Sequence, residues 1–391
     1  MAETRYPIDP ITLRIAGVDW MYWKNVEITR QMDAIAGAFS ISLADRWTDG
    51  AQASAEALPI AAGMECELLI GDDPVIKGYI DKASPSFSAQ DHGISISGRD
   101  RSADLVDCAA VHKPGHWMGV SALQLAQDLA KPFGVSVRAE GNIGAPIPSL
   151  VLEQGETAFE ALDRALKLRE LLACPDGAGG LVLLKAGARK NDTALKQGEN
   201  ILTASADFDM ADRFSDYLVY GQQPGGDAIY GLPVCAVHAA AKDPAVRRYR
   251  PMIIRAESSV DAGAAQQRAV WEKTVRAARS VTVSVTVQGF RQGKPGDTTV
   301  PLWQLNAMTD VDIPFLRLKQ RLVAGKITFR RDPQSGSTTT LELRDPAAFK
   351  PEPKTQGIRD IGNARIETEK DLTTRNQEYA AQAHRQIKEG A

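Results

Sequence analysis

Three pairs of ionisable side chains in this 391-residue chain have spacings that could support chemistry. The first pair is His112 and His116, which on a helix would direct both imidazoles toward one metal ion. Pro114 lies between them and disfavours a helix, and no carboxylate accompanies them. A loop that carries two histidines is therefore the favoured interpretation, and we predict no metal site.

The other two pairs are aspartates. Asp310 and Asp312 lie two positions apart on a predicted strand, so both side chains face the same way. Paired carboxylates can serve as acid and base in glycoside hydrolysis, but charged side chains at a sheet edge also prevent unwanted strand pairing. We favour the edge interpretation for this pair and for Asp207 with Asp209.

Two clusters could bind a ligand or a partner. Trp20, Tyr22 and Trp23 lie close together at a predicted turn, where aromatic rings either bind a sugar or bury an oligomer interface. Residues 247–250 read Arg-Arg-Tyr-Arg, a cluster that could contact phosphate. We predict an interface or an ion-pair patch there, and interface packing for the aromatic residues.

The remaining composition offers little chemistry. No phosphate-binding loop, nucleophile elbow, zinc-protease motif or dinucleotide fingerprint is present, so we predict no cofactor. The net charge of −3 gives no general reason to expect nucleic-acid binding. No signal peptide and no membrane-length apolar run is expected, hence no membrane insertion. The cysteines are far apart and predicted to be buried, reduced thiols: Cys66, Cys108, Cys174 and Cys235.

The elements that position these residues are mostly strands. The first 105 residues alternate apolar and polar side chains with the period of short antiparallel strands. Helical periodicity appears at 120–132, 156–168 and 264–279. Residues 280–289 alternate valine with threonine or serine, which predicts a strand with one buried face.

One β-hairpin pattern occurs twice. Residues 76–81 and 93–100 form a glycine-containing strand, a polar turn and an alternating strand that ends in Arg99-Asp100. Residues 323–328 and 336–345 repeat this order and end in Arg344-Asp345. The pattern predicts two copies of one small β-domain, with a coincidental similarity as the alternative.

The predicted fold is therefore α+β and mostly β, with two antiparallel β-barrels and an inserted small α+β module. We assign residues 1–110 to the first barrel, 111–195 to the module, and 196–245 to strands and a loop that complete the first barrel. Residues 246–350 form the second barrel. Residues 351–391 carry mixed charges and scattered apolar side chains, which predicts a flexible or partner-ordered tail.

Residues 98–108, Gly-Arg-Asp-Arg-Ser-Ala-Asp-Leu-Val-Asp-Cys, resemble a signature of Mu-like contractile-phage baseplate hub proteins. This is the tail protein P family, related to the late control D group and to the hub part of secretion-system spikes. Further pieces similar to the family follow in its order across residues 8–350: residues 132–134, 154–157, 220–222, 248–251, 268–272 and 289–303.

The resemblance implies tube-like barrels and a homotrimer whose ring has pseudo-sixfold symmetry. Such a hub joins the tail tube protein to the central spike protein, contacts baseplate wedge proteins, and surrounds a channel through which DNA passes without specific binding. It implies a virion protein of the tail baseplate, made in the host cytoplasm, and no enzyme. Candidate assembly-interface residues are Arg99, Asp100, Arg248, Tyr249, Arg250, Trp303, Arg344 and Asp345.

Two alternatives remain open at this point. The chain could be a tail-associated cell-wall hydrolase, which would need a catalytic constellation that the sequence does not display. It could also be the hub part of a type VI-like secretion spike.

Overall fold

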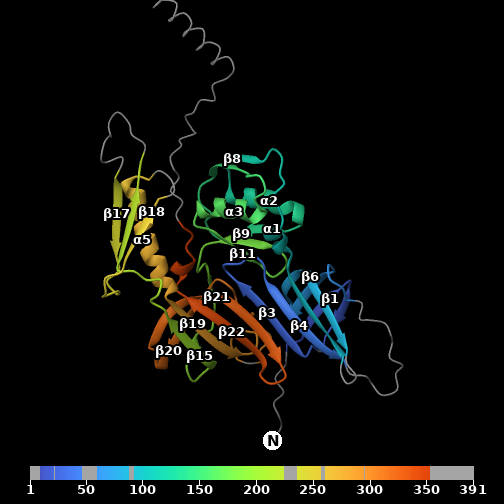
Figure 1. The fold of residues 1–391 in the computed structure, drawn as a ribbon. Coiled ribbons are helices and arrows are strands. Elements are labelled where there is room, and N and C mark those ends of the chain that lie inside the picture. The colour runs from blue at the N-terminus through green and yellow to red at the C-terminus, as the bar shows by residue number, and fades with distance from the viewer. Residues whose placement is uncertain are drawn as a thin grey trace, which may run out of the picture.

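The computed structural model describes residues 9–21, 23–45, 60–87, 92–223, 236–256, 260–294 and 296–352. These residues form a mostly β protein with few helices, in agreement with the predicted class (Figure 1). Tyr22, Cys235 and the predicted tail from residue 353 onward lie outside the described residues. No helix in the described part of the chain combines the length and apolarity needed to cross a membrane.

The strands fall into three groups along the chain. Strands β1 to β7 occupy Ile11–Ile15, Val18–Trp20, Asn25–Gln31, Ala38–Asp45, Glu65–Ile70, Asp73–Phe87 and His92–Asp100. Strands β8 to β14 occupy His116–Val120, Val137–Ala139, Ile147–Val151, Leu172–Pro175, Leu181–Leu184, Arg189–Lys190 and Leu195–Lys196. Strands β15 to β22 occupy Ile201–Phe208, Asp216–Gly221, Val237–Lys242, Pro251–Arg255, Val281–Gln288, Ala307–Ile313, Leu318–Asp332 and Gly336–Arg344.

The predicted helices are confirmed with shifted ends. The α-helices are α1 Asp104–Asp107, α2 Ala122–Ala130, α3 Ala158–Lys167 and α5 Ala262–Arg279. Short 3₁₀ helices are η1 Arg101–Ala103, η2 Lys131–Phe133, η3 Pro314–Leu316 and η4 Pro346–Phe349. Each of the three longer helices begins at a side chain that accepts a backbone N–H, namely Ser121, Thr157 and Asp261.

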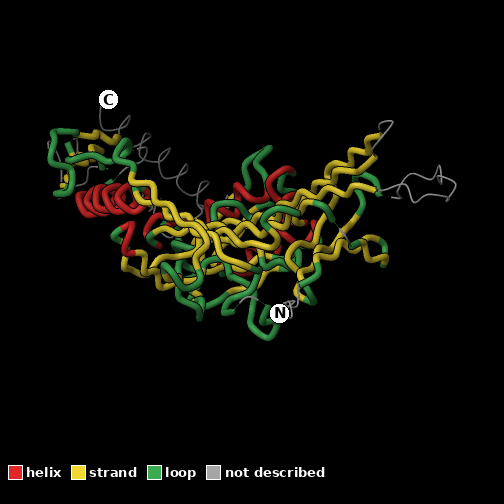
Figure 2. The backbone as a smooth tube through the Cα atoms, turned by 90° about the horizontal axis from the view of Figure 1, so that it is seen from below, coloured by secondary structure: helices red, strands yellow, loops and turns green. Residues whose placement is uncertain are grey.

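The principal sheet joins both ends of the chain. Its main path runs β15-β19-β22-β21-β3-β4-β7-β6-β5-β1-β2, with β20, β13 and β14 attached beside β21. Residues 26–31 of β3 pair antiparallel with residues 326–331 of β21. We call this pairing the β3–β21 seam. Figure 2 shows the strands running through the middle of the molecule, with α5 at one end.

The strand order repeats within this sheet. The first half contains β3-β4-β7-β6-β5, and the second half contains β15-β19-β22-β21-β20. The two central hairpins each have one bulge, between Ile80 and Lys82 and between Ala324 and Lys326. The predicted internal repeat is confirmed by this order and by the bulges.

The glycines that define the repeat in the sequence are not equivalent in the structure. Gly325 occupies the bulge of the second hairpin, where Asp81 stands in the first. Gly78 instead pairs with Asp100, three residues before the bulge. A carbon atom added at Gly325 would lie 2.3 Å from the Phe349 ring. Because Gly325 has no side chain, the Phe349 ring of η4 can pack directly on the bulge.

The assignment of residues 196–245 to the first barrel is corrected by the strand pairing. Strand β15 pairs with β19 of the second half, with Phe208 opposite Val281. Strands β16 and β17 join β18 in a separate sheet of order β17-β16-β18, whose core includes residues of α5. Alternation alone specifies a strand but not its partner, which is why the sequence misassigned β15. No pairing among the described residues closes either half, so closure into barrels remains a prediction.

One apolar core runs under both halves of the principal sheet. Ile28, Ile96, Val285, Phe329 and Leu341 are buried in this single cluster. A second core lies inside the middle module, where α2 and α3 pack on β9, β11 and β12. Both sides of the β3–β21 seam contribute to the first core, so the two halves share their hydrophobic stabilisation.

This shared core predicts that the two halves of the sheet unfold together. Ile96 and Leu341 hold equivalent positions in β7 and β22, and both are fully buried. Ile96→Ala and Leu341→Ala should each lower the unfolding free energy by about 2–5 kcal/mol and shift the same transition. Urea unfolding followed by circular dichroism measures this, with exposed Ser95→Ala as the control. Separate transitions, each moved by one variant only, would contradict the prediction.

Candidate assembly surfaces

The end of β7 carries the first candidates, and they bind within the chain. The Arg99 guanidinium donates to Asp81 at 2.7 Å and to Asp107 at 2.8 Å. Asp81 comes from the bulge of β6, and Asp107 ends α1. Hydrogen bonds to these two carboxylates raise the pKa of Arg99. Arg99 therefore ties the hairpin to the first helix, and its charge is already paired.

Asp100 is buried beside Arg99. Its Oδ2 accepts the N–H of Gly37 at 2.9 Å, and its Oδ1 accepts the N–H of Lys77 at 3.1 Å. Burial raises the pKa of Asp100 to about 6, although the nearby Arg30 guanidinium and these two hydrogen bonds act in the opposite direction. A buried carboxylate bound to the loop before β4 and to strand β6 cannot also contact another subunit, so Asp100 is a structural residue of the fold.

The same region attaches the middle module to the sheet. Arg30 of β3 donates to the carbonyl of Pro175 at 2.6 Å, at the end of β11. Arg101 donates to the carbonyl of Gly134 at 3.3 Å and forms an ion pair with Glu65 of β5. These polar contacts position the module above the first half of the sheet.

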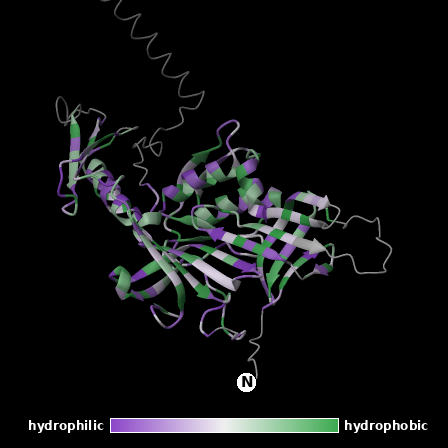
Figure 3. Cartoon of the chain, turned by 60° about the horizontal axis from the view of Figure 1, so that its bottom comes forward, coloured by the Kyte–Doolittle hydropathy of each residue, from purple (hydrophilic) through white to green (hydrophobic). Residues whose placement is uncertain are grey.

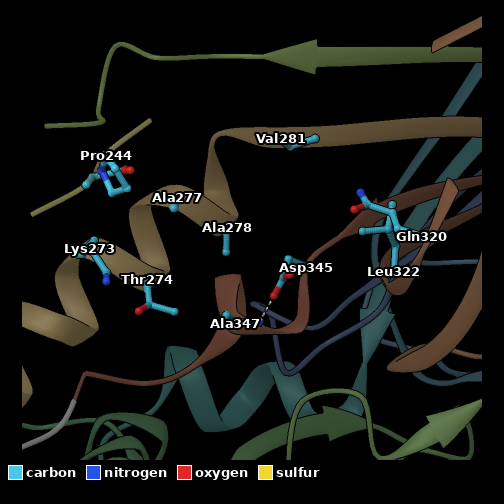
Figure 4. Close-up of a pocket in the computed structure, with 11 residues that line it drawn as sticks. Pro244, Lys273, Thr274, Ala277, Ala278, Val281, Gln320, Leu322, Asp345 and Ala347 are labelled. Carbon is cyan, nitrogen blue, oxygen red and sulfur yellow. Dashed lines mark hydrogen bonds between the residues drawn. The ribbon is translucent and has the colours of Figure 1, made fainter. Parts of the chain in front are cut away.

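The second Arg-Asp pair is more accessible than the first. Arg344 is half-buried, and exposed Asp345 accepts the N–H of Ala347 at 2.8 Å to cap η4. A cavity of about 410 Å³ lies beside Asp345, and Lys273 of α5 is among its lining residues (Figure 4). A second cavity, of about 380 Å³, lies beside Arg99 and Asp100.

The arginine cluster at 247–250 precedes β18. Arg248 is exposed, and Tyr249 has 84% of its surface exposed. Arg250 is held inside the chain, because its guanidinium donates to the carbonyl of Ala211 at 2.6 Å and lies 5.2 Å from the Phe214 ring centre. Arg248 and Tyr249 keep the exposure that an assembly surface needs, whereas Arg250 supports the loop.

Trp303 does not reach the surface. Its ring is buried in the core under the second half of the sheet, and its backbone N–H donates to Phe290 at 3.2 Å. The structure therefore places Trp303 and Asp100 among the packing residues. The eight candidates do not converge on one site.

The Asp310–Asp312 pair and His112 are engaged in other contacts. Asp310 and Asp312 face Arg321 and Lys319 across β20 and β21, at 2.8 and 3.4 Å. The hydrogen bond from Arg321 lowers the pKa of Asp310, which opposes a role as a general acid. His112 stacks on Trp117 with 4.5 Å between ring centres.

Metal and thiol chemistry receive no support from the geometry. Among the described residues, no group of three or more His, Cys, Asp or Glu side chains is arranged to hold a metal ion. Cys66 and Cys174 are buried as predicted, and burial raises the pKa of each thiol to about 12. Cys108 is exposed, which corrects the prediction for that residue.

An exposed apolar group that the sequence did not predict lies at one end of the sheet. Leu202 and Phe208 of β15 have exposed fractions of 53% and 58%, and Met210 follows with 39%. Phe208 continues the alternation of Ala204 and Ala206, which pack against the core. This alternation is visible in the sequence. It indicates an exposed Phe208 only once β15 is known to be the last strand of the sheet.

Three family models match the chain. "Mu phage baseplate assembly protein GpP-like, N-terminal" matches residues 10–100, and "Baseplate hub protein gp44-like, second domain" matches residues 102–185. "Mu phage baseplate assembly protein GpP, fourth domain" matches residues 261–352. The matched segments correspond to the first half of the principal sheet, to the middle module, and to α5 with most of the second half of the sheet.

Individual relatives agree with these matches. The baseplate hub protein gp44 of Escherichia phage Mu is 34% identical over 347 residues, covering 87% of this chain and 88% of gp44. The 43 kDa tail protein of prophage MuSo2 from Shewanella oneidensis is 31% identical, with a TM-score of 0.77 and coverage of 88% and 99%. The tail protein from Neisseria meningitidis MC58 shares the fold, with 21% identity, a TM-score of 0.73 and coverage of 88% and 99%.

The buried carboxyl of Asp100 predicts a distinctive dependence of stability on pH. Its folded-state pKa of about 6 lies above the ordinary 3.8, so its stabilising contribution is complete below the lower value and is lost as pH rises through the upper one. The loss amounts to about 3 kcal/mol. The difference in unfolding free energy between wild type and Asp100→Asn should shrink accordingly between pH 4 and 7, as measured by urea unfolding.

Asp107→Asn provides the control, because the hydrogen bond from Arg99 lowers the pKa of Asp107. Its stabilising contribution is present above the ordinary pKa and is lost only as pH falls below it. A constant difference between wild type and Asp100→Asn across pH 4 to 7 would show that Asp100 does not titrate there.

Proposed function

The chain belongs to the Mu-like family of phage baseplate hub proteins, and from this premise we propose that it forms the homotrimeric hub of a contractile tail. Membership makes it a structural protein of the virion, located in the tail baseplate. The proposal concerns what membership leaves open, namely the number of subunits, the symmetry of the ring, and the channel.

The repeated strand order carries this proposal. Each chain holds two units of the same topology in one sheet. Three chains would supply six similar units around an axis while the assembly keeps threefold symmetry. Such a ring can match a sixfold tail tube on one side and a trimeric spike on the other, because each partner meets a surface with its own symmetry.

The polar face of the sheet suits a channel for DNA. The face opposite the apolar core carries many small neutral side chains from both halves: Thr29, Ser40, Ser95, Ser97, Ser284, Thr286, Thr328 and Thr340. Two cations on the same face are paired with carboxylates, Lys326 with Glu342 and Arg330 with Asp332. Figure 3 displays the mixture of hydrophilic and hydrophobic residues along these strands. A surface of hydroxyl groups on which Lys326 and Arg330 are already paired with carboxylates offers phosphates no strong attraction, so DNA would pass without being held.

The middle module and the β17-β16-β18 sheet extend away from the principal sheet in Figure 1. We assign contacts with baseplate wedge proteins to these parts, and contacts with the tail tube and central spike to the two rims of the ring. The exposed pair Arg248 and Tyr249 adjoins the small sheet and is the candidate contact of that part.

A phage hub is favoured over the two alternatives. The family models describe phage baseplate proteins. A hydrolase would need a carboxyl that stays protonated, whereas Asp310 is paired with Arg321 and has a lowered pKa. We therefore propose a structural role without catalysis.

Sedimentation equilibrium of the purified chain tests the proposal. We expect a species of three times the 42.2 kDa chain mass, and ring-shaped particles in electron microscopy. Asp310→Ala with Asp312→Ala should leave both unchanged. A monomer at every concentration would overturn the trimer, and hydrolysis of cell wall in a zymogram that these substitutions abolish would reopen the enzyme alternative.

A further inference from the structure

The described part of the chain ends in a short segment that lies along α5. We call this segment, residues 348–352, the strap. Arg279, the last residue of α5, donates to the carbonyl of Ala348 at 3.0 Å. Arg268, nearer the start of the helix, forms an ion pair with Glu352. The strap therefore runs antiparallel to α5 and brings the chain to the N-terminal half of that helix.

Next to the strap, α5 has an open apolar face. Val270, Thr274 and Ala277 lie on one side of the helix, because positions three and four apart share a face. Val270 is 41% exposed, whereas Thr274 and Ala277 are half-buried and line the cavity of about 410 Å³ in Figure 4. An apolar row thus leads from the middle of α5 into the cavity.

The cavity lies where α5 meets the principal sheet. Figure 4 shows α5 on one side and η4, with Asp345 before it, on the other, and Leu322 of β21 also lines the cavity. Lys273 places a cation among the apolar lining residues. One water molecule needs only about 30 Å³, so the cavity can hold a whole aliphatic side chain.

We propose that the chain turns back after Glu352 and that its own residues 358–361 pack on this face of α5, with Ile361 in the cavity. Pro353 and Gly357, which are turn-forming residue types, lie between the strap and this segment. The proposal goes beyond the function proposed above and does not depend on it. The returning segment would touch both α5 and the principal sheet, and so fix the small β17-β16-β18 sheet in place.

Length supports this alignment. Val270 and Ala277 are about 10 Å apart along the axis of α5, at about 1.5 Å per residue. Ile358 and Ile361 would be separated by about 9 Å in a polyproline II conformation, which rises about 3.1 Å per residue. That conformation has three residues per turn, so both isoleucines would face the helix. Ile358 would cover Val270 when Ile361 reaches the cavity beside Ala277.

Charge supports the same alignment. Asp360 directly precedes Ile361 in the sequence, and Lys273 lines the cavity that Ile361 would enter. The alignment therefore brings a carboxylate to the ammonium group of α5 at a partly enclosed place, where an ion pair is less screened by water. The apolar and charged side chains of the segment thus match those of the helix face in one register.

The accessibility of a cysteine in place of Val270 tests the contact. Val270→Cys is combined with Cys108→Ser and Cys235→Ser, since the other two cysteines are buried. Maleimide labelling of the full chain should be slower by roughly tenfold or more than labelling of a chain that ends at Glu352, because the docked segment must open first. Met118→Cys, on exposed β8, is the control and should label equally in both chains.

Equal labelling rates of the Val270 cysteine in the two chains would overturn the proposal. Circular dichroism of the shortened chain checks that it keeps the fold of the full chain, so that faster labelling reports loss of the contact.

Cross-linking identifies which chain supplies the segment. Ala277→Cys with Ile361→Cys, in the same background, should form a disulfide within one chain under mild oxidation. Peptide mass spectrometry should find this link in the monomer band of a non-reducing gel. Met118→Cys with Ile361→Cys is the matched control and should remain unlinked. A link between two chains would show that a second copy covers the face, and absence of a link would show another occupant; either result would overturn the proposal.

A charge exchange tests the register. Lys273→Glu and Asp360→Lys should each speed the labelling of Val270→Cys toward the rate of the shortened chain, because like charges then meet. The two substitutions together restore an opposite pair and should restore slow labelling. Glu378→Lys, a charge reversal outside the docked segment, should leave the rate unchanged. Fast labelling of the double variant would contradict the pairing of Asp360 with Lys273.

Discussion

The pairing of β3 with β21 is the constraint on which the rest of the structure depends. It joins residues 26–31 to residues 326–331, so the segments at the two ends of the folded chain meet in the middle of one sheet. Closing a loop of this length has an entropic cost that grows only slowly with length, and the shared core beneath the seam offsets it. Because of this pairing, the two repeats form one body.

The two repeats have the same strand order, but different parts of the chain are attached to them. In the first, the bulge holds Asp81, whose carboxylate binds Arg99, and Asp100 is buried against the loop before β4 and strand β6. In the second, the bulge holds Gly325, which admits the ring of Phe349, and Asp345 caps η4. The first arrangement fixes the middle module above the sheet, and the second brings η4 against α5. One topology thus supports two different attachments.

The polar Gly-Arg-Asp-Arg segment at residues 98–101 therefore makes its contacts within one subunit. Arginines of the Gly-Arg-Asp-Arg segment bind carboxylates and carbonyls of the same chain, which leaves Arg248, Tyr249 and Asp345 as the exposed members of the predicted set.

The sequence by itself determined the mostly β class, the longer helices, the repeated hairpin and the resemblance to hub proteins, because periodicity and turn residues are local properties. The sequence misassigned β15, because alternation predicts a strand but not the strand with which it pairs. It also predicted Asp100 and Trp303 as interface residues, because the type of a charged or aromatic residue does not determine whether it is buried. Only the tertiary structure decided that β21 pairs with β3, that Asp100 is buried, and which edges remain open. Those outcomes depend on residues hundreds of positions apart, whose contacts exist only once the chain is packed.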